Sequence, residues 1–416
     1  MSLTPYLVVF GATFAMAFLM TPVVRKLAIK VNAVDRPSDR KVHPRPTPTM
    51  GGLAMFVAVV AGLGVAHQLH FFRALFRTSS EPTGVLVACA VVVAIGTYDD
   101  VRGTAVPVKL AGQLMAAGLL VLFGVQLLYF FFPGQGILVL GSDLAVPLTV
   151  LWVVGMVNAV NLIDGLDGLA AGMVGIAALA FFGYVFLSPS PFGPSFETGS
   201  STAALLSALA AGGALGFLPW NFHPARIFMG DSGAMLLGVL LAAATVSGVG
   251  RTFVSPSRSD LAAFSIPVLV PLVILAVPLL DVALAILRRM RRGAPVTHAD
   301  KEHIHHRLMD FGHSHRQAVL LMYLWSALIS GSALAVALLH ARLMAGVIVL
   351  GAFLTIVGTA IPRAWPRIRA ARRSLASDGA PASAVAPPAA VVPPAAVVPP
   401  VPPDDAGPSL RAHETP

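Results

Sequence analysis

Long apolar stretches, separated by short polar segments, recur along most of this chain. Each stretch runs for roughly 17 to 22 residues, which is long enough to cross the hydrocarbon layer of a membrane as a helix. We count about eleven, centred near residues 13, 60, 90, 116, 153, 178, 209, 241, 275, 328 and 352. The pattern predicts an all-α, polytopic membrane bundle of about eleven transmembrane helices.

The polar segments carry positive charge unevenly, and this sets the expected orientation. Nearly all Lys and Arg residues fall in segments at about 24–50, 99–109, 161–168, 219–232 and 287–316 and in the C-terminal region. The opposite side has only Arg73, Arg77, Arg251, Arg258 and Arg342. Because positive loops stay cytoplasmic, the N-terminus is expected outside and the C-terminus in the cytoplasm. The first span lacks a basic leader, so it is not interpreted as a secretory signal.

Composition supports a membrane protein and narrows its partners. Hydrophobic residues make up 56% and charged residues 11% of the 416-residue chain, with a mean hydropathy of +0.81, far outside the globular range. The net charge of +9 is explained by topology and by anionic membrane lipids, so no nucleic-acid partner is expected. The single Cys89 lies in an apolar span, where packing is the expected role.

The composition changes again near the C-terminus. From about residue 363, basic residues give way to repeats of Pro, Ala and Val and then to an acidic, polar end. Such a stretch cannot build a core. We therefore predict a transmembrane domain over 1–362 and a cytoplasmic tail over 363–416, disordered from 375 onward. A Pro-rich docking segment is the alternative.

The segment NAVNLIDGLDGLAAG places polar groups at the end of an apolar span. Asn158, Asn161, Asp164 and Asp167 recur every three residues, so neighbours could share a helical face as far as the glycines allow. Ionisable groups at membrane depth are costly, which favours a functional role. A solvated helix end is the alternative.

The adjacent carboxylates of Asp99 and Asp100 would repel each other unless a cation lies nearby. They are candidates for a metal site, a general base or both, and an exposed helix end is the alternative. Further along, Gly230 and Gly233 flank Asp231 and would permit close backbone approach to a ligand. Ser232 is expected to cap the following helix and leave its N-terminus facing a phosphate. A tight turn between spans is the alternative there.

Two inner loops carry basic side chains that suit anions. His303, His306 and Arg307 would share one face of a helix, which suits a pyrophosphate. A zinc site or a solvated loop remains an alternative, and the histidine spacing is irregular for zinc. In the first loop, Lys41 and Arg45 could bind a lipid or nucleotide phosphate, although topology explains the same charges equally well.

Five motifs, in order, carry a family resemblance: DRPSDRKVHPRPTPTMGG, GTYDDVRG, NAVNLIDGLDGLAAG, NFHPARIFMGDSG and DKEHIHHRL. Together they closely resemble the polyprenyl-phosphate N-acetylhexosamine-1-phosphate transferases of the glycosyltransferase 4 type. Such enzymes move a sugar 1-phosphate from a UDP-sugar onto a membrane polyprenyl phosphate, release UMP and require magnesium. The resemblance covers about residues 20 to 316 and implies a bacterial inner-membrane enzyme with a cytoplasmic active site.

The resemblance also implies residue roles. Asp231 and Asn161 would bind Mg²⁺, with Mn²⁺ as a substitute, and Asp99 and Asp100 would form the acidic pair of the catalytic centre. Asp99 is our choice for the base that deprotonates the lipid phosphate. The remaining roles are a nucleoside pocket lined by Asp164, Gly165, Leu166, Asp167 and Phe228, and a diphosphate group of Lys109, His303, His305, His306 and Arg307.

One loop indicates the donor sugar. The peptidoglycan branch, which uses the muramoyl-pentapeptide nucleotide, typically has three consecutive histidines, whereas this chain has HIHH. HIHH resembles the branch that uses UDP-N-acetylglucosamine for teichoic acid, O-antigen or arabinogalactan synthesis. The expected acceptor is undecaprenyl or decaprenyl phosphate, and a homodimer is left open. The alternatives are the muramoyl-pentapeptide enzyme and, from another class, an ion-coupled transporter.

Overall fold

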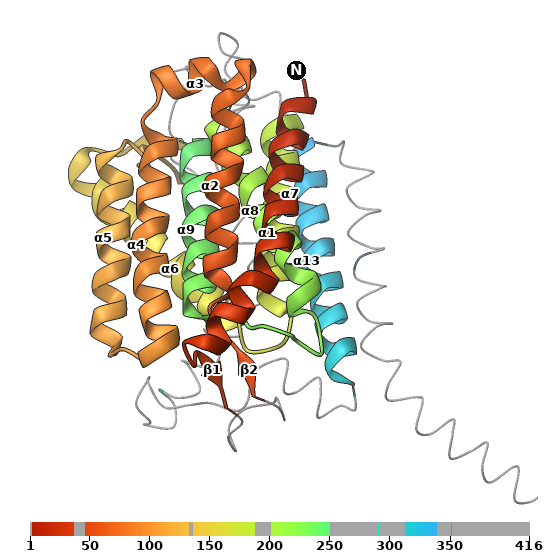
Figure 1. Cartoon of the computed structure of the whole chain (residues 1–416). Coiled ribbons are helices and arrows are strands. Elements are labelled where there is room, and N and C mark those ends of the chain that lie inside the picture. Colours follow the sequence, from red (N-terminus) through yellow and green to blue (C-terminus); the bar gives the residue numbers. More distant parts are fainter. Residues whose placement is uncertain are drawn as a thin grey trace, which may run out of the picture. The chain divides into compact units, whose positions relative to one another are not determined.

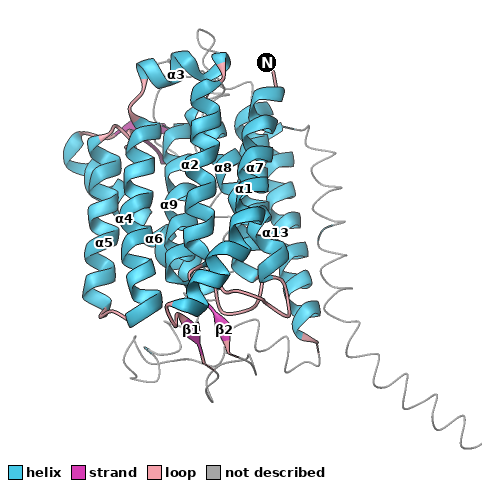
Figure 2. Cartoon of the chain, in the orientation of Figure 1, coloured by secondary structure: helices cyan, strands magenta, loops and turns pink. Residues whose placement is uncertain are grey.

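The computed structural model describes residues 2–36, 46–132, 136–187, 201–249 and 313–338 and the single residues 290 and 351. This part of the chain is mainly α-helical (Figures 1 and 2). The main helices are α1 (Thr4–Lys30), α2 (Gly51–Gln68), α4 (Glu81–Arg102), α5 (Val106–Leu122), α6 (Ser142–Ile163), α7 (Leu169–Leu187), α8 (Thr202–Asn221), α9 (Gly230–Val249) and α13 (His315–Leu338).

The smaller elements connect these helices. A 3-10 turn η1 (His70–Phe72) leads into the short helix α3 (Arg73–Thr78). Two antiparallel ribbons pair β1 (Val34–Asp35) with β2 (Thr47–Pro48) and β3 (Tyr129–Phe132) with β4 (Gly136–Val139). The β1–β2 ribbon and the α4–α5 connection lie at one end of the bundle, the lower end in Figure 1, and α3 lies at the other end.

Within the described ranges, the predicted spans from the first to the eighth, and the one near residue 328, coincide with helices. Seven of these helices are long and apolar enough to cross a membrane, and α5 is shorter. The membrane-protein prediction is therefore confirmed. The spans centred near 275 and 352 and the tail lie outside the described residues. The total of eleven, the orientation of the termini and the domain boundary stay predictions.

Several side chains that we placed in loops lie on helices instead. The predicted loop at about 24–50 was wrong at its start, because α1 continues to Lys30 over 27 residues. Asp99 and Asp100 belong to the last turn of α4, Lys109 to α5 and Asp231 to the first turn of α9. The reason is length: at 1.5 Å per residue, α1 exceeds the roughly 30 Å hydrocarbon layer, so its end continues into the polar zone.

The core lies around α8 and α9. In each, 83% of the spanning window is buried, against 28% in α1, so α1 is a peripheral helix. Helix α9 packs against α4, α6, α8 and α2. Both central helices are rich in Ala and Gly, which let backbones approach where apolar burial gives no advantage over lipid. For example, a Cβ on Gly212 of α8 would lie 2.8 Å from the Phe10 carbonyl of α1.

Backbone hydrogen bonds join the α8–α9 connection to the β1–β2 ribbon and to the start of α2, at the lower end of the bundle in Figure 1. The Phe228 amide donates to the Pro48 carbonyl at 2.8 Å, while the amides of Gly51 and Gly52 donate to Phe228 and Met229 at 3.0 and 2.9 Å. The β1–β2 ribbon and the α8–α9 connection therefore form one hydrogen-bonded unit. This unit fixes where α9 begins, and α9 begins with the sequence Gly230-Asp231-Ser232.

Candidate active site

Two carboxylates and one ammonium meet where α4, α5 and α9 come together. The Lys109 Nζ lies 2.8 Å from Asp99 Oδ2 and also contacts Asp231 Oδ2. The other oxygen of Asp99 accepts hydrogen bonds from the Thr104 amide at 2.7 Å and its hydroxyl at 2.6 Å. All three charged side chains are mostly buried. We call Asp99, Lys109 and Asp231 the lysine cluster.

Asp100 makes a different set of contacts from its neighbour Asp99. Its Oδ1 accepts from the Asp231 amide at 2.9 Å, and its Oδ2 accepts from the Ser232 hydroxyl at 2.7 Å. The start of α9 is thus capped by a carboxylate from α4. Our expectation that Ser232 caps α9 was wrong, while a phosphate near this helix start stays a prediction. Ser232 lies inside the first turn, and two of the first N–H groups already have a protein acceptor.

The end of α6 separates the two amides of the predicted repeat from its two carboxylates. Asn158 and Asn161 lie on the last turns of the helix, whereas Asp164 is its C-cap residue and Asp167 belongs to the following turn. The four therefore do not share one helical face, because the helix ends at Ile163. Asn158 donates to Gln113 Oε1 at 2.7 Å. Asn161 is half-buried, and its side chain forms no hydrogen bond to another described residue.

Asp164 is a further carboxyl group close to the lysine cluster. Burial, followed by the nearby carboxylates of Asp231, Asp100 and Asp167, raises the pKa of Asp164 to about 8. A carboxyl group with that pKa is largely protonated at neutral pH. An additional cation close by would favour its ionisation, because in the described part of the site one lysine accompanies five carboxyl groups, those of Asp99, Asp100, Asp164, Asp167 and Asp231.

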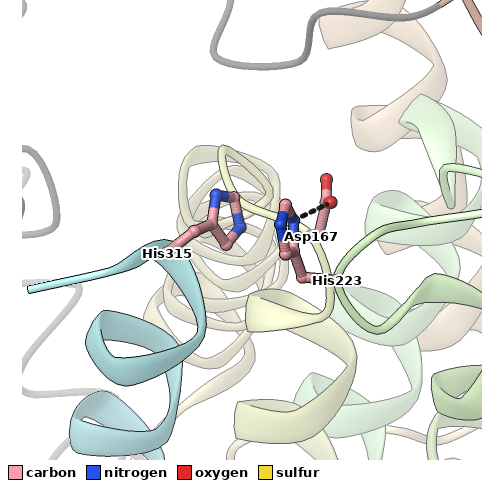
Figure 3. Close-up of side chains that lie close together, drawn as sticks. All are labelled: Asp167, His223 and His315. Carbon is pink, nitrogen blue, oxygen red and sulfur yellow. Dashed lines mark hydrogen bonds and ion pairs between the residues drawn. The ribbon is translucent and has the colours of Figure 1, made fainter.

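A second group of side chains joins two connections and the start of α13 (Figure 3). His223 Nδ1 lies 2.7 Å from Asp167 Oδ2, which also accepts from the Ala225 amide at 3.1 Å. The ring of His315, at the start of α13, stacks on His223 with centroids 4.2 Å apart and planes 19° from parallel. We call Asp167, His223 and His315 the histidine cluster. It joins the α6–α7 turn, the α8–α9 connection and α13.

The histidine cluster contains metal-ligating residue types, and one ligand atom from each lies within 4.8 Å of the others. A metal bound by an imidazole nitrogen lies in the plane of that ring. Two stacked, nearly parallel rings cannot both direct a nitrogen lone pair at one ion unless a ring rotates. In the observed arrangement the cluster is a hydrogen-bonded brace, and Tyr323 of α13 adds to it by donating to the Gly168 carbonyl.

The other predicted binding residues fall into two groups. Around the α6–α7 turn, Gly165 is exposed and Leu166 is buried, and Phe228 of the α8–α9 connection is half-buried. The prediction of a nucleoside pocket formed by these residues stays a prediction. The rest of the proposed anion-binding residues lie outside the described residues: Lys41, Arg45, His303, His305, His306 and Arg307.

The structure adds site residues that we did not assign from the sequence. Thr104, which holds Asp99, follows Gly103 immediately after α4, and a hydroxyl residue just beyond a helix end was a usable signal. His223 stands inside NFHPARIFMGDSG but was given no role. His315 was likewise given no role. Their pairing with Asp167 depends on contacts between distant segments, which spacing along the chain does not reveal.

Comparison with known proteins gives a consistent result. The family described as "Glycosyl transferase family 4" matches residues 82–249, a range that includes Asp99, Asp100, Lys109, the α6–α7 turn and Asp231. The decaprenyl-phosphate N-acetylglucosaminephosphotransferase of Mycobacterium leprae is 42% identical over 359 residues, covering 85% of this chain and 89% of the relative.

More distant relatives have similar names. The probable undecaprenyl-phosphate N-acetylglucosaminyl 1-phosphate transferase of Bacillus subtilis is 38% identical and covers 79% of this chain and 84% of its own. The undecaprenyl-phosphate alpha-N-acetylglucosaminyl 1-phosphate transferase of Salmonella typhi is 28% identical over 76% and 80%. With its motifs, its membrane-spanning helices and these matches in agreement, the chain belongs to glycosyl transferase family 4.

Proposed function

We propose that this protein transfers N-acetylglucosamine 1-phosphate from UDP-N-acetylglucosamine to a membrane polyprenyl phosphate and releases UMP. This would be the first lipid-linked step of a cell-envelope polysaccharide. The observation that carries the proposal is 42% identity, over most of both chains, to a relative named for decaprenyl phosphate and N-acetylglucosamine. The HIHH motif supports the same sugar. A transporter finds no support in these relatives.

The lysine cluster supports a divalent cation as part of the reaction. Carboxylate oxygens from Asp99 and Asp231, which belong to different helices, both contact a single positive group, the Lys109 ammonium. This convergence, together with the excess of carboxyl groups, fits Mg²⁺, which prefers a few oxygen ligands plus substrate phosphates. Asp231 and Asn161 would hold the ion. When bound, magnesium would neutralise charge on the diphosphate and on the UMP leaving group.

The protein side chains would mainly position the two anionic substrates. The lipid phosphate must align with the β-phosphorus of the donor, and such alignment and charge neutralisation dominate phosphoryl transfer. In this proposal Lys109 would offer its ammonium to the diphosphate, and Asp99 would accept a proton from the acceptor. Because a phosphate monoester is already anionic at neutral pH, we expect the base to add only modestly to the rate.

The decisive experiment is a competition between two donors. Purified protein, polyprenyl phosphate and magnesium are incubated with equal amounts of UDP-N-acetylglucosamine and the muramoyl-pentapeptide nucleotide, and the lipid products are identified by mass spectrometry. We expect N-acetylglucosamine-diphosphoryl lipid, with UMP released in equal amount. A site shaped for the small ring excludes the peptide arm. A muramoyl-pentapeptide lipid as main product would refute the donor assignment, and no lipid product from either donor would refute the activity.

A further inference from the structure

Asp99 and Asp100 are adjacent in sequence, yet their carboxylates make contacts on different sides of α4. Asp99 contacts Lys109 and Thr104, on the α5 side of the site. Asp100 turns to α9, where both of its oxygens accept hydrogen bonds. Oδ1 receives the Asp231 amide, and Oδ2 receives the Ser232 hydroxyl at 2.7 Å and the Ser232 amide at 3.4 Å.

The backbone around these hydrogen bonds is packed without spare space. A Cβ on Gly230, which has a φ of +68°, would collide with both carboxylate oxygens of Asp100 and with the Thr49 hydroxyl. A Cβ on Gly96 of α4 would strike the backbone of Ser232, and one on Gly52 of α2 would strike that of Gly233. Helices α2 and α4 thus touch the first turn of α9 directly, and Asp100 lies within that contact.

Asp231 lies in this capped first turn of α9 and connects the helix to the lysine cluster. Its amide is bound by Asp100, while its carboxylate contacts Lys109. A negative group at a helix N-terminus satisfies otherwise unpaired N–H groups and interacts favourably with the helix dipole. The geometry of Asp100 is that of a helix cap contributed by another helix: both oxygens accept from α9, and Oδ1 also accepts from the Thr49 hydroxyl at 3.4 Å.

We propose that Asp100 is a positioning residue, which holds Asp231 in place by capping α9 and does not itself contact donor, acceptor or metal. The inference rests on the proposed transferase reaction for its kinetic consequences. It separates the acidic pair into Asp99, which belongs to the reacting group, and Asp100, which acts through Asp231.

An amide substitution distinguishes the two roles. Asn is as good a helix cap as Asp, and its oxygen can accept from the Asp231 amide. Its NH₂ group can donate to the Ser232 hydroxyl oxygen. The Ser232 hydroxyl can then donate its own proton to the Met229 carbonyl, which lies 3.3 Å away. A metal ligand or base, in contrast, loses its function when the negative charge is removed. Asp100→Asn should therefore be tolerated, while the same change at Asp99 should not.

The test compares kcat and the magnesium dependence of Asp100→Asn, Asp100→Ala and the matched neighbour Asp99→Asn. We expect Asp100→Asn to keep kcat within about 10-fold of the unsubstituted protein, with an unchanged magnesium requirement. Asp99→Asn should lose about 100-fold or more. Asp100→Ala should lower kcat and raise the magnesium requirement together, because Asp231 is displaced. A folded Asp100→Asn protein as inactive as Asp99→Asn would overturn the proposal.

Thermal unfolding in detergent tests the cap without the reaction. Asp100→Ala should lower the unfolding midpoint by about 2–4 °C, as expected for the loss of a helix cap, and Asp100→Asn should restore most of it. If the unsubstituted protein shows no transfer, the proposed function fails, and this measurement alone decides the cap. An Asp100→Ala protein that unfolds at the unsubstituted midpoint would overturn the inference whatever the activity.

Discussion

The lysine cluster and the histidine cluster both contain aspartate side chains, but the charge of these side chains is balanced differently in the two clusters. In the lysine cluster, carboxylates from α4 and α9 face one ammonium, so negative charge is in excess. In the histidine cluster, Asp167 is matched by an imidazole and a backbone amide, and a second ring is stacked alongside. The first lies at the ends of spanning helices, whereas the second joins connections.

This difference in charge balance separates side chains proposed to take part in the reaction from side chains that hold the loops in place. Excess negative charge held by helix ends is costly unless a cation balances it, so the lysine cluster is where the proposed reaction would take place. Matched groups in connections hold loops without needing a ligand. Changes to the two clusters should therefore have effects of different kinds.

Asp231→Asn should reduce kcat by about 1,000-fold or more while leaving the protein folded and membrane-inserted. Loss of one carboxylate charge would remove the proposed metal interaction, worth about several kcal/mol in the transition state, with little change in packing. Radiolabelled UDP-N-acetylglucosamine and polyprenyl phosphate give the rate, and thermal unfolding gives the fold control. Turnover at the unsubstituted rate under saturating magnesium would contradict the metal assignment.

Lys109→Met should lower kcat by about 100-fold, the scale of losing one positive group at developing phosphate charge. Methionine keeps much of the side-chain volume but leaves the Asp99 and Asp231 carboxylates without their shared partner. Release of UMP under steady-state conditions is the measurement. If Lys109 only balanced charge in the resting protein, high magnesium would restore the full rate, and its proposed role toward the diphosphate would be wrong.

Asp167→Asn should raise the donor KM about 5- to 10-fold and change kcat little, because it weakens a brace rather than a reacting group. His223→Phe is the matched variant: it keeps a ring against His315 but cannot pair with Asp167. Both should give the same KM and a similar fall in the unfolding midpoint. A kcat loss as large as that of Asp231→Asn would place Asp167 among the reacting groups and end the comparison.

Deleting residues 375–416 should change specific activity in detergent by less than about twofold. A Pro- and Ala-rich segment without a periodic apolar face contributes no packing to the bundle, and both clusters lie within residues 99–315. Full-length and shortened proteins are compared in the same transfer assay. A large loss would mean that the tail contributes to the site.

The sequence predicted those parts of the molecule that depend on single segments. Apolar runs predicted α1, α2, the helices from α4 to α9, and α13, but not the short α3. The rule on positive loops placed Asp99, Asp164 and Asp231 at one end of the bundle before any contact was known. Helix ends were less well predicted, because hydropathy changes gradually whereas hydrogen bonding stops at a residue. The missed pairs, such as Asp167 with His223, join residues 56 positions apart.

The cap on α9 was missed for the same reason. Ser232 is a good capping residue by type, and local preference therefore assigned the cap to it. In the structure Asp100 takes that position from 131 residues away, because glycines at 52, 96 and 230 let three backbones meet there. Local rules cannot anticipate an acceptor that arrives from another helix.

The glycine contacts among α2, α4 and α9 have a consequence for engineering. Backbone touches backbone at Gly52 and Gly96, so α2 and α4 are packed directly against the first turn of α9. New donor preferences are therefore best sought by exchanging the connecting loops at this end of the bundle, because such exchanges leave the spacing of Asp99 and Asp231 intact.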